Sequence, residues 1–182
     1  NFNMSFMEAV PAQLASVDYL NEAAGLTLGR IYLGGHSKGG NLAVYATVKC
    51  APEVRERIAA AYSNDGPGFS REFIESDDYR TIKTKLKTLI PQSSVVGLLL
   101  EHEENYEVVK SNEVGLMQHD PFSWEVLGGS FIRLDSITEE SRTIDRRLKA
   151  WLSEMDVKQR EEFVDAVYET LAATSATTLT DI

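Results

Sequence analysis

The chain has 182 residues, 43% of them hydrophobic and 25% charged, a balance typical of a soluble protein with a substantial core. Its net charge of −10 argues against nucleic acids and anionic membrane surfaces as partners, because both attract basic proteins. No apolar run approaches the ~20 residues of a membrane-spanning helix, so stable membrane insertion is not expected. Cys50 is the only cysteine, which fits a reducing compartment and predicts a cytoplasmic protein.

The first half of the chain predicts a helix followed by strands that alternate with helices. Residues 5–25 carry apolar side chains at spacings of three and four, with Pro11 in the first turn and Gly25 as the stop. The segments that follow are predicted as strands over 30–34, 58–63 and 86–90, a helix over 39–49, and a helical or irregular stretch over 69–79.

The second half of the chain ends in two predicted helices. A strand is expected over residues 106–110, preceded by a short helix that Ser93 or Ser94 caps. Apolar stripes then predict helices over 141–155 and 157–173, marked by Ile144, Leu148, Trp151, Met155, Phe163, Val167 and Leu171. Strands that alternate with helices indicate an α/β fold, with a mostly parallel sheet covered by helices in a single domain over residues 1–182.

The most informative motif is Gly35-His36-Ser37-Lys38-Gly39, which lies between a predicted strand and a predicted helix. In this context Gly-x-Ser-x-Gly is typical of a sharp turn that exposes a nucleophilic serine, here Ser37. We expect glycines at the flanking positions because larger side chains would collide with the strand and the helix. The N–H group of Lys38 would begin the helix and stabilise an oxyanion. The alternative is a glycine-rich turn without chemistry; a phosphate loop is disfavoured because the G-x-x-x-x-G-K-[ST] pattern is missing.

A nucleophilic serine needs a base, and the chain offers three histidines. His36 adjoins Ser37 and is expected to point away from its hydroxyl as a packed neighbour. His102 lies in an acidic stretch typical of a solvated surface. His119 follows the last predicted strand and meets the expected chain order of nucleophile, acid and base. We therefore predict His119 as the base, and a loop histidine satisfied by local backbone is the alternative.

The acid that orients the base has several candidates. Asp65 ends the strand over 58–63, at the edge where Ser37 is expected, and we predict that it orients His119. A turn residue making an Asx-type hydrogen bond is the alternative interpretation of Asp65. The remaining acidic candidates are Glu101, Glu103, Glu104 and Asp120.

Several segments of the chain together resemble a known family. The stretch "IYLGGHSKGGNLAVYA" is similar to the nucleophile elbow of lipase-like α/β-hydrolases. Together with "YSNDGPGF", "IPQSSVVGLLLEHEE" and "MQHDPFSW", it resembles the Mbeg-like family of bacterial proteins, which is similar to class 3 lipases. The resemblance implies an α/β-hydrolase fold and a serine hydrolase, with Ser37 as the nucleophile and His119 as the late histidine.

Two departures from the family pattern shape these expectations. Class 3 lipases carry an aspartate after the strand that here ends in "IPQSS", whereas this chain has Ser93 and Ser94, so Asp65 would serve from the preceding strand. In the family, a segment bearing "F-R-G-T" precedes the stretch that resembles "NFNMSF". The chain is therefore expected to be the C-terminal portion of a longer hydrolase, without its first strands.

The sequence thus predicts hydrolysis of a small-molecule carboxylic ester or acyl lipid through Ser37, His119 and Asp65. No cofactor and no metal are expected, because no cluster has the spacing of metal ligands. A non-catalytic interaction domain that retains the hydrolase shell is the alternative, and a peptidase on the same fold is a third. The stretch "FSWEVLGGSF" and the C-terminal helices are expected to pack on the core rather than to form a lid. No oligomeric state is predicted.

Overall fold

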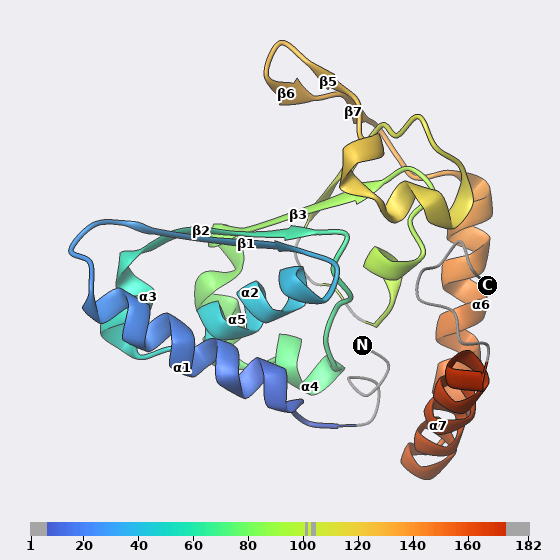
Figure 1. Cartoon of the computed structure of the whole chain (residues 1–182), viewed down its shortest axis with the longest axis horizontal. Coiled ribbons are helices and arrows are strands. Elements are labelled where there is room, and N and C mark those ends of the chain that lie inside the picture. The colour runs from blue at the N-terminus through green and yellow to red at the C-terminus, as the bar shows by residue number, and fades with distance from the viewer. Residues whose placement is uncertain (1–6, 101, 103–104, 174–182) are drawn as a thin grey trace.

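The computed structural model describes residues 7–100, 102 and 105–173 (Figure 1). In chain order, its helices and strands are α1 (Pro11–Gly25), β1 (Ile31–His36), α2 (Lys38–Lys49), α3 (Pro52–Arg57), β2 (Ile58–Asn64), α4 (Arg71–Ile74), α5 (Asp77–Ile82), β3 (Leu86–Pro91), β4 (Tyr106–Val109), β5 (Val126–Leu127), β6 (Ser130–Phe131), β7 (Arg133–Leu134), α6 (Glu139–Glu154) and α7 (Val157–Ala173). Short 3-10 turns are η2 (Lys83–Lys85), η3 (Val96–Leu98), η4 (Gly115–His119) and η5 (Pro121–Ser123).

A five-stranded sheet in the order β1-β2-β3-β4-β7 organises the described part of the chain. Strands β1 to β4 run parallel, and β7 pairs antiparallel with β4. The prediction of an α/β fold with a mostly parallel sheet is therefore confirmed. Strand β7 and the β5–β6 hairpin, which projects away from the sheet in Figure 1, were not predicted.

Helices α1 to α5 lie on one side of the sheet (Figure 1). Helix α2 follows β1 directly and packs on β1 and β2. Its Val44 and Val48 are buried in one cluster with Ala61 of β2, and small or β-branched side chains permit this close approach. Helix α1 covers α2 in turn, since Leu20 is buried together with Ala46. The packing fixes α2, and so the turn that precedes it, against the sheet.

A second, smaller cluster lies at the β4 end of the sheet, formed by the buried side chains of Ile90, Leu98, Val108 and Ile137. Helices α6 and α7 stand beyond this end in Figure 1. The expected apolar stripe of α6 is only partly covered, because Ile144 and Trp151 remain 42% and 39% exposed. The side chains of Val167 and Leu171 lie outside the described residues. None of the described helices is long and apolar enough to cross a membrane.

The predicted helices are found in place, with differences in detail. Helix α1 begins at Pro11, and positions 5 and 6 of the predicted helix lie outside the described residues. The stretch 69–79 forms α4 and the start of α5, each capped by a serine hydroxyl. The short helix expected after Ser94 is only the 3-10 turn η3, in which the Gly97 N–H group donates to the Ser94 hydroxyl.

Candidate active site

Ser37 lies at a sharp turn between β1 and α2. Strand β1 ends at His36 and α2 begins at Lys38, so the serine is the single residue between them. Its φ of 55° and ψ of −127° lie outside the regions that residues with a side chain favour. Strain of this kind costs roughly 1–3 kcal/mol and is typical of functional turns. The predicted strand–turn–helix setting of the motif is confirmed.

Two nearby glycines make this turn sterically possible. A Cβ atom at Gly35 would lie 2.2 Å from the carbonyl carbon of Gly39, and one at Gly40 would lie 2.7 Å from Ser63 Oγ. A Cβ atom at Gly39 would meet nothing within 4 Å. The expected collision is therefore confirmed at Gly35 and wrong at Gly39, where the added atom would face open space. Gly40 permits the close approach of α2 to β2.

Asp65 and His119 meet at the carboxyl edge of the sheet. His119 Nδ1 lies 2.7 Å from Asp65 Oδ2. Because an ionised carboxylate only accepts hydrogen bonds, this contact places the imidazole proton on Nδ1. The Asp65 side chain is 1% exposed and the His119 side chain 19%. The pair leaves His119 Nε2 as the ring nitrogen with a free lone pair.

The Asp65 carboxylate has further donors that the sequence did not reveal. Ser94 Oγ donates to Asp65 Oδ1 over 2.5 Å, and the Gly97 N–H group donates to the same oxygen over 3.0 Å. Gly97 has no room for a side chain, because a Cβ atom would lie 2.3 Å from Asp65 Oδ1. Ser94 belongs to the "IPQSS" segment, and its position there was the available signal. This serine stabilises a carboxylate from the neighbouring strand.

The residue before His119 anchors its loop. Gln118 is buried, and its side chain accepts from the Ser93 N–H group at 3.0 Å and donates to the Glu113 carbonyl at 2.8 Å. Its own carbonyl accepts from the indole N–H group of Trp124 at 2.9 Å. Trp124 is buried and packs on the core as expected for "FSWEVLGGSF", whereas Phe122 and Leu127 of the same stretch are 96% and 75% exposed, so the prediction of core packing is wrong for them. These bonds hold the polypeptide on both sides of His119.

Ser37 lies next to the Asp65–His119 pair through its backbone. Strands β1 and β2 are parallel, and His36 is paired with Asn64, the residue before Asp65. The Ser37 N–H group donates to the Asn64 carbonyl at 2.9 Å, and His36 Nε2 lies 2.6 Å from the His119 carbonyl oxygen. Within the described residues, no hydrogen bond joins the Ser37 hydroxyl to the His119 ring.

The first turn of α2 leaves a donor beside the serine. The Lys38 N–H group has no acceptor among residues 7–100, 102 and 105–173, as is usual for the start of a helix. It is thus available to an anionic oxygen. In the same part of the chain, no group of three or more His, Cys, Asp or Glu side chains is placed to hold a metal ion.

The other acidic candidates do not join this site in the described structure. Asp120 is exposed and accepts a hydrogen bond from the Phe122 N–H group at 2.9 Å, which is a local cap of η5. Glu101, Glu103 and Glu104 lie outside the described residues. Asp65 is therefore the carboxylate bonded to His119.

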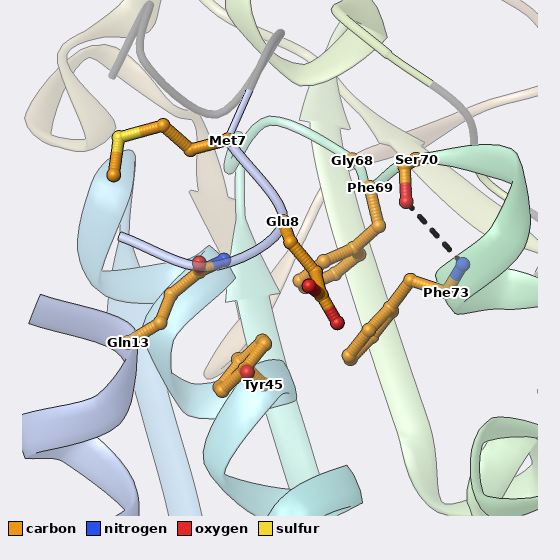
Figure 2. Close-up of a pocket in the computed structure, with 8 residues that line it drawn as sticks. All are labelled: Met7, Glu8, Gln13, Tyr45, Gly68, Phe69, Ser70 and Phe73. Carbon is orange, nitrogen blue, oxygen red and sulfur yellow. Dashed lines mark hydrogen bonds between the residues drawn. The ribbon is translucent and has the colours of Figure 1, made fainter. Parts of the chain in front are cut away.

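Figure 2 shows a small pocket of the structure. It is lined by Met7, Glu8, Gln13, Tyr45, Gly68, Phe69, Ser70 and Phe73. Glu8 extends toward the Phe73 ring, which stacks on Tyr45 at a centroid distance of 5.2 Å. Burial, with a smaller effect of the Glu8 carboxylate, raises the pKa of the Tyr45 hydroxyl. The predicted nucleophile, acid and base do not line this pocket.

A family model described as Mbeg1-like matches residues 1–169, which include every strand of the sheet and every residue of the candidate site. No curated protein matches the chain.

Proposed function

The chain belongs to the Mbeg1-like family, as its sequence predicts, and on this premise we propose that it is a serine hydrolase of carboxylic esters or acyl lipids. The observation that carries the proposal is the bond between His119 Nδ1 and the buried Asp65 carboxylate, next to a serine at a strained turn. A histidine held in this way presents Nε2 as a base, and the carboxylate stabilises the imidazolium that forms.

The proposed reaction uses one nucleophile, one base and one hydrogen-bond donor to the oxyanion. His119 Nε2 takes the proton of Ser37 Oγ while that oxygen bonds to the ester carbonyl carbon. The Lys38 N–H group stabilises the oxyanion of the tetrahedral intermediate. The intermediate expels the alcohol, which receives the proton from His119, and a water molecule then hydrolyses the acyl-enzyme by the same steps. The bond between Ser37 and His119 forms in this scheme when substrate binds, since such contacts commonly tighten in the complex.

We also propose that this α/β fold is, more specifically, an α/β-hydrolase fold. It is supported by the parallel sheet, by a serine turn that leads from β1 into α2, and by the chain order Ser37, Asp65, His119. An aspartate after β2 instead of after β3 fits this scheme, because Ser94 and Gly97 both donate to it from the segment after β3.

The side chains around the base favour an apolar acyl group as the substrate. Leu116, Met117 and Phe122 flank His119 in η4 and η5 and are 57%, 47% and 96% exposed. Exposed apolar side chains of this kind commonly mark a surface that binds an apolar partner. An ester with an apolar acyl chain would bury part of them.

Replacing the nucleophile tests the proposal. Ser37→Ala in the full chain should lower hydrolysis of p-nitrophenyl butyrate by about 10³-fold or more and abolish labelling by a fluorophosphonate probe. Ser70→Ala is the matched control, because it removes a serine hydroxyl that caps α4 away from the site. Equal hydrolysis and labelling by wild type and Ser37→Ala would refute the proposal.

A non-catalytic interaction domain is the second candidate function. The observation that favours it is the lack of a hydrogen bond between the Ser37 hydroxyl and the His119 ring in the described structure. The fluorophosphonate probe separates the two candidates, because it reacts only with an activated serine. Unlabelled wild-type protein would favour the interaction domain.

A further inference from the structure

We infer that His36 is a positioning residue, which fixes the base against the strand that carries the nucleophile. The inference rests on the proposed function and assigns a role to the residue that adjoins Ser37. His36 is the last residue of β1 and so moves with the sheet, whereas His119 belongs to a turn between β4 and β5. A direct bond between the two histidines joins these elements across 83 residues of chain.

The hydrogen bond from His36 has a defined direction. His36 Nε2 lies 2.6 Å from the His119 carbonyl oxygen, and a carbonyl oxygen only accepts. The Nε2 atom of His36 therefore carries a proton and donates it. That nitrogen is occupied by the bond, so His36 acts on the backbone of His119 instead of on the serine hydroxyl.

The two imidazole rings also pack against each other. Their centroids lie 4.4 Å apart with an angle of 42° between the planes. His119 is thus held by its carbonyl, by the contact of its ring with His36 and by Nδ1, which bonds to Asp65. Three contacts at different points of one residue fix both the position and the rotation of its ring. Only the Nε2 edge remains for the serine proton.

This restraint matters because, apart from Trp124 at the end of η5, the apolar side chains of the turns on either side of His119 are exposed. Leu116, Met117 and Phe122 are largely exposed, so they contribute little of the packing that usually holds a loop in place. Hydrogen bonds, including the one from His36, therefore have to hold this loop in place. A base displaced by about 1 Å costs about 10²-fold in rate, so loss of this bond is expected to affect catalysis.

Two substitutions separate the hydrogen bond from the ring contact. His36→Phe keeps a ring but removes the donor, whereas His36→Gln places an amide N–H group near the position of Nε2. We expect His36→Phe to lower kcat on p-nitrophenyl butyrate by about 10²-fold with little change in KM, and His36→Gln to recover most of that loss. Wild-type kcat in His36→Phe, or no recovery in His36→Gln, would overturn the inference.

Arg57→Met provides the matched control for a general loss of stability. Arg57 also donates from its side chain to backbone carbonyls, those of Ala24, Thr27 and Gly29, but it does so at the opposite end of β1. This variant should lower Tm and leave kcat unchanged. A fall in kcat matching that of His36→Phe would show that loss of stability alone explains the effect, which would overturn the role of His36.

A spectroscopic measurement distinguishes failure of this inference from failure of the proposed function. If wild-type protein neither hydrolyses the ester nor takes the fluorophosphonate label, the proposed function fails. The contact between His36 and His119 is then tested by the imidazole ¹⁵N and ¹H resonances of His119. These resonances should shift in His36→Phe and stay unchanged in Arg57→Met. Unchanged His119 resonances in His36→Phe would overturn the inference whatever the activity.

Discussion

Asp65→Asn changes one atom of a buried carboxylate from an acceptor to a donor. Three donors surround this side chain: His119 Nδ1 at 2.7 Å, Ser94 Oγ at 2.5 Å and the Gly97 N–H group at 3.0 Å. An amide side chain has one acceptor oxygen, so it cannot accept from both sides. Its NH₂ group must face either His119 or the pair formed by Ser94 and Gly97.

The two orientations of this amide differ in free energy. If the NH₂ group faces Gly97, two donors face each other, because the backbone N–H group cannot turn away. A buried donor left without an acceptor costs about 1–3 kcal/mol. If it faces His119, the imidazole adapts by moving its proton from Nδ1 to Nε2. The second orientation is therefore favoured, and it leaves Nε2 without the lone pair that would accept the Ser37 proton. In a Ser-His-Asp triad the wrong tautomer costs about 10⁴-fold in kcat.

The assay for Asp65→Asn is kcat on p-nitrophenyl butyrate, measured together with Tm. We expect kcat to fall by about 10³–10⁴-fold while the protein stays folded. Asp120→Asn is the control, because it makes the same change of charge at the next position after His119, on an exposed carboxylate that caps Phe122. A folded Asp65→Asn variant within tenfold of wild type would refute the tautomer argument.

Four further predictions concern stability and reactivity. Gly35→Ala should lower the free energy of unfolding in urea by more than about 4 kcal/mol, since its Cβ would lie 2.2 Å from the Gly39 carbonyl carbon. Gly39→Ala, with open space around its Cβ, should leave that free energy unchanged or raise it by about 1 kcal/mol. Burial raises the pKa of the Cys50 thiol, so Ellman's reagent should react at least about tenfold more slowly with folded than with urea-unfolded protein at pH 7.5. The raised pKa of Tyr45 means that the folded chain holds this proton more tightly than the unfolded chain, so stability should fall as pH rises above about 10. Tyr45→Phe should flatten that fall in urea unfolding curves at pH 9 and pH 11.

The sequence predicts the parallel part of the fold because its short apolar segments are closed by proline or by turn residues. Residues 39–49 and 58–63 were assigned correctly to within one residue at each end, since Pro52 follows the helix and the β2 segment is apolar and ends in a turn. Strand β7 spans two residues and has no period to detect. The β5–β6 hairpin did have a signal, because Gly128 and Gly129 both adopt positive φ, as a two-residue hairpin turn requires.

A residue of the candidate site was predictable where its neighbours in the sequence mark it. Ser37 is marked by the glycines beside it, and Asp65 by the end of its strand. Ser94 had a signal in its place in "IPQSS", but its partner Asp65 and the bond from His36 to His119 were not predictable, because these bonds join residues 29 and 83 positions apart and depend on how neighbouring strands align. Sequence spacing alone contains no information on such alignment. The collision expected at Gly39 was wrong for a related reason, since the path of the helix decides which glycine is crowded.

The large separation of His36 and His119 along the chain has a consequence for folding. Closing a loop of that length costs more entropy than forming a helical turn, so contacts of this kind form late. A refolding chain should recover its helical circular dichroism before it recovers a complete site. During synthesis, Ser37 leaves the ribosome well ahead of His119, so a nascent chain that stops before residue 119 would hold the proposed nucleophile and acid without the proposed base.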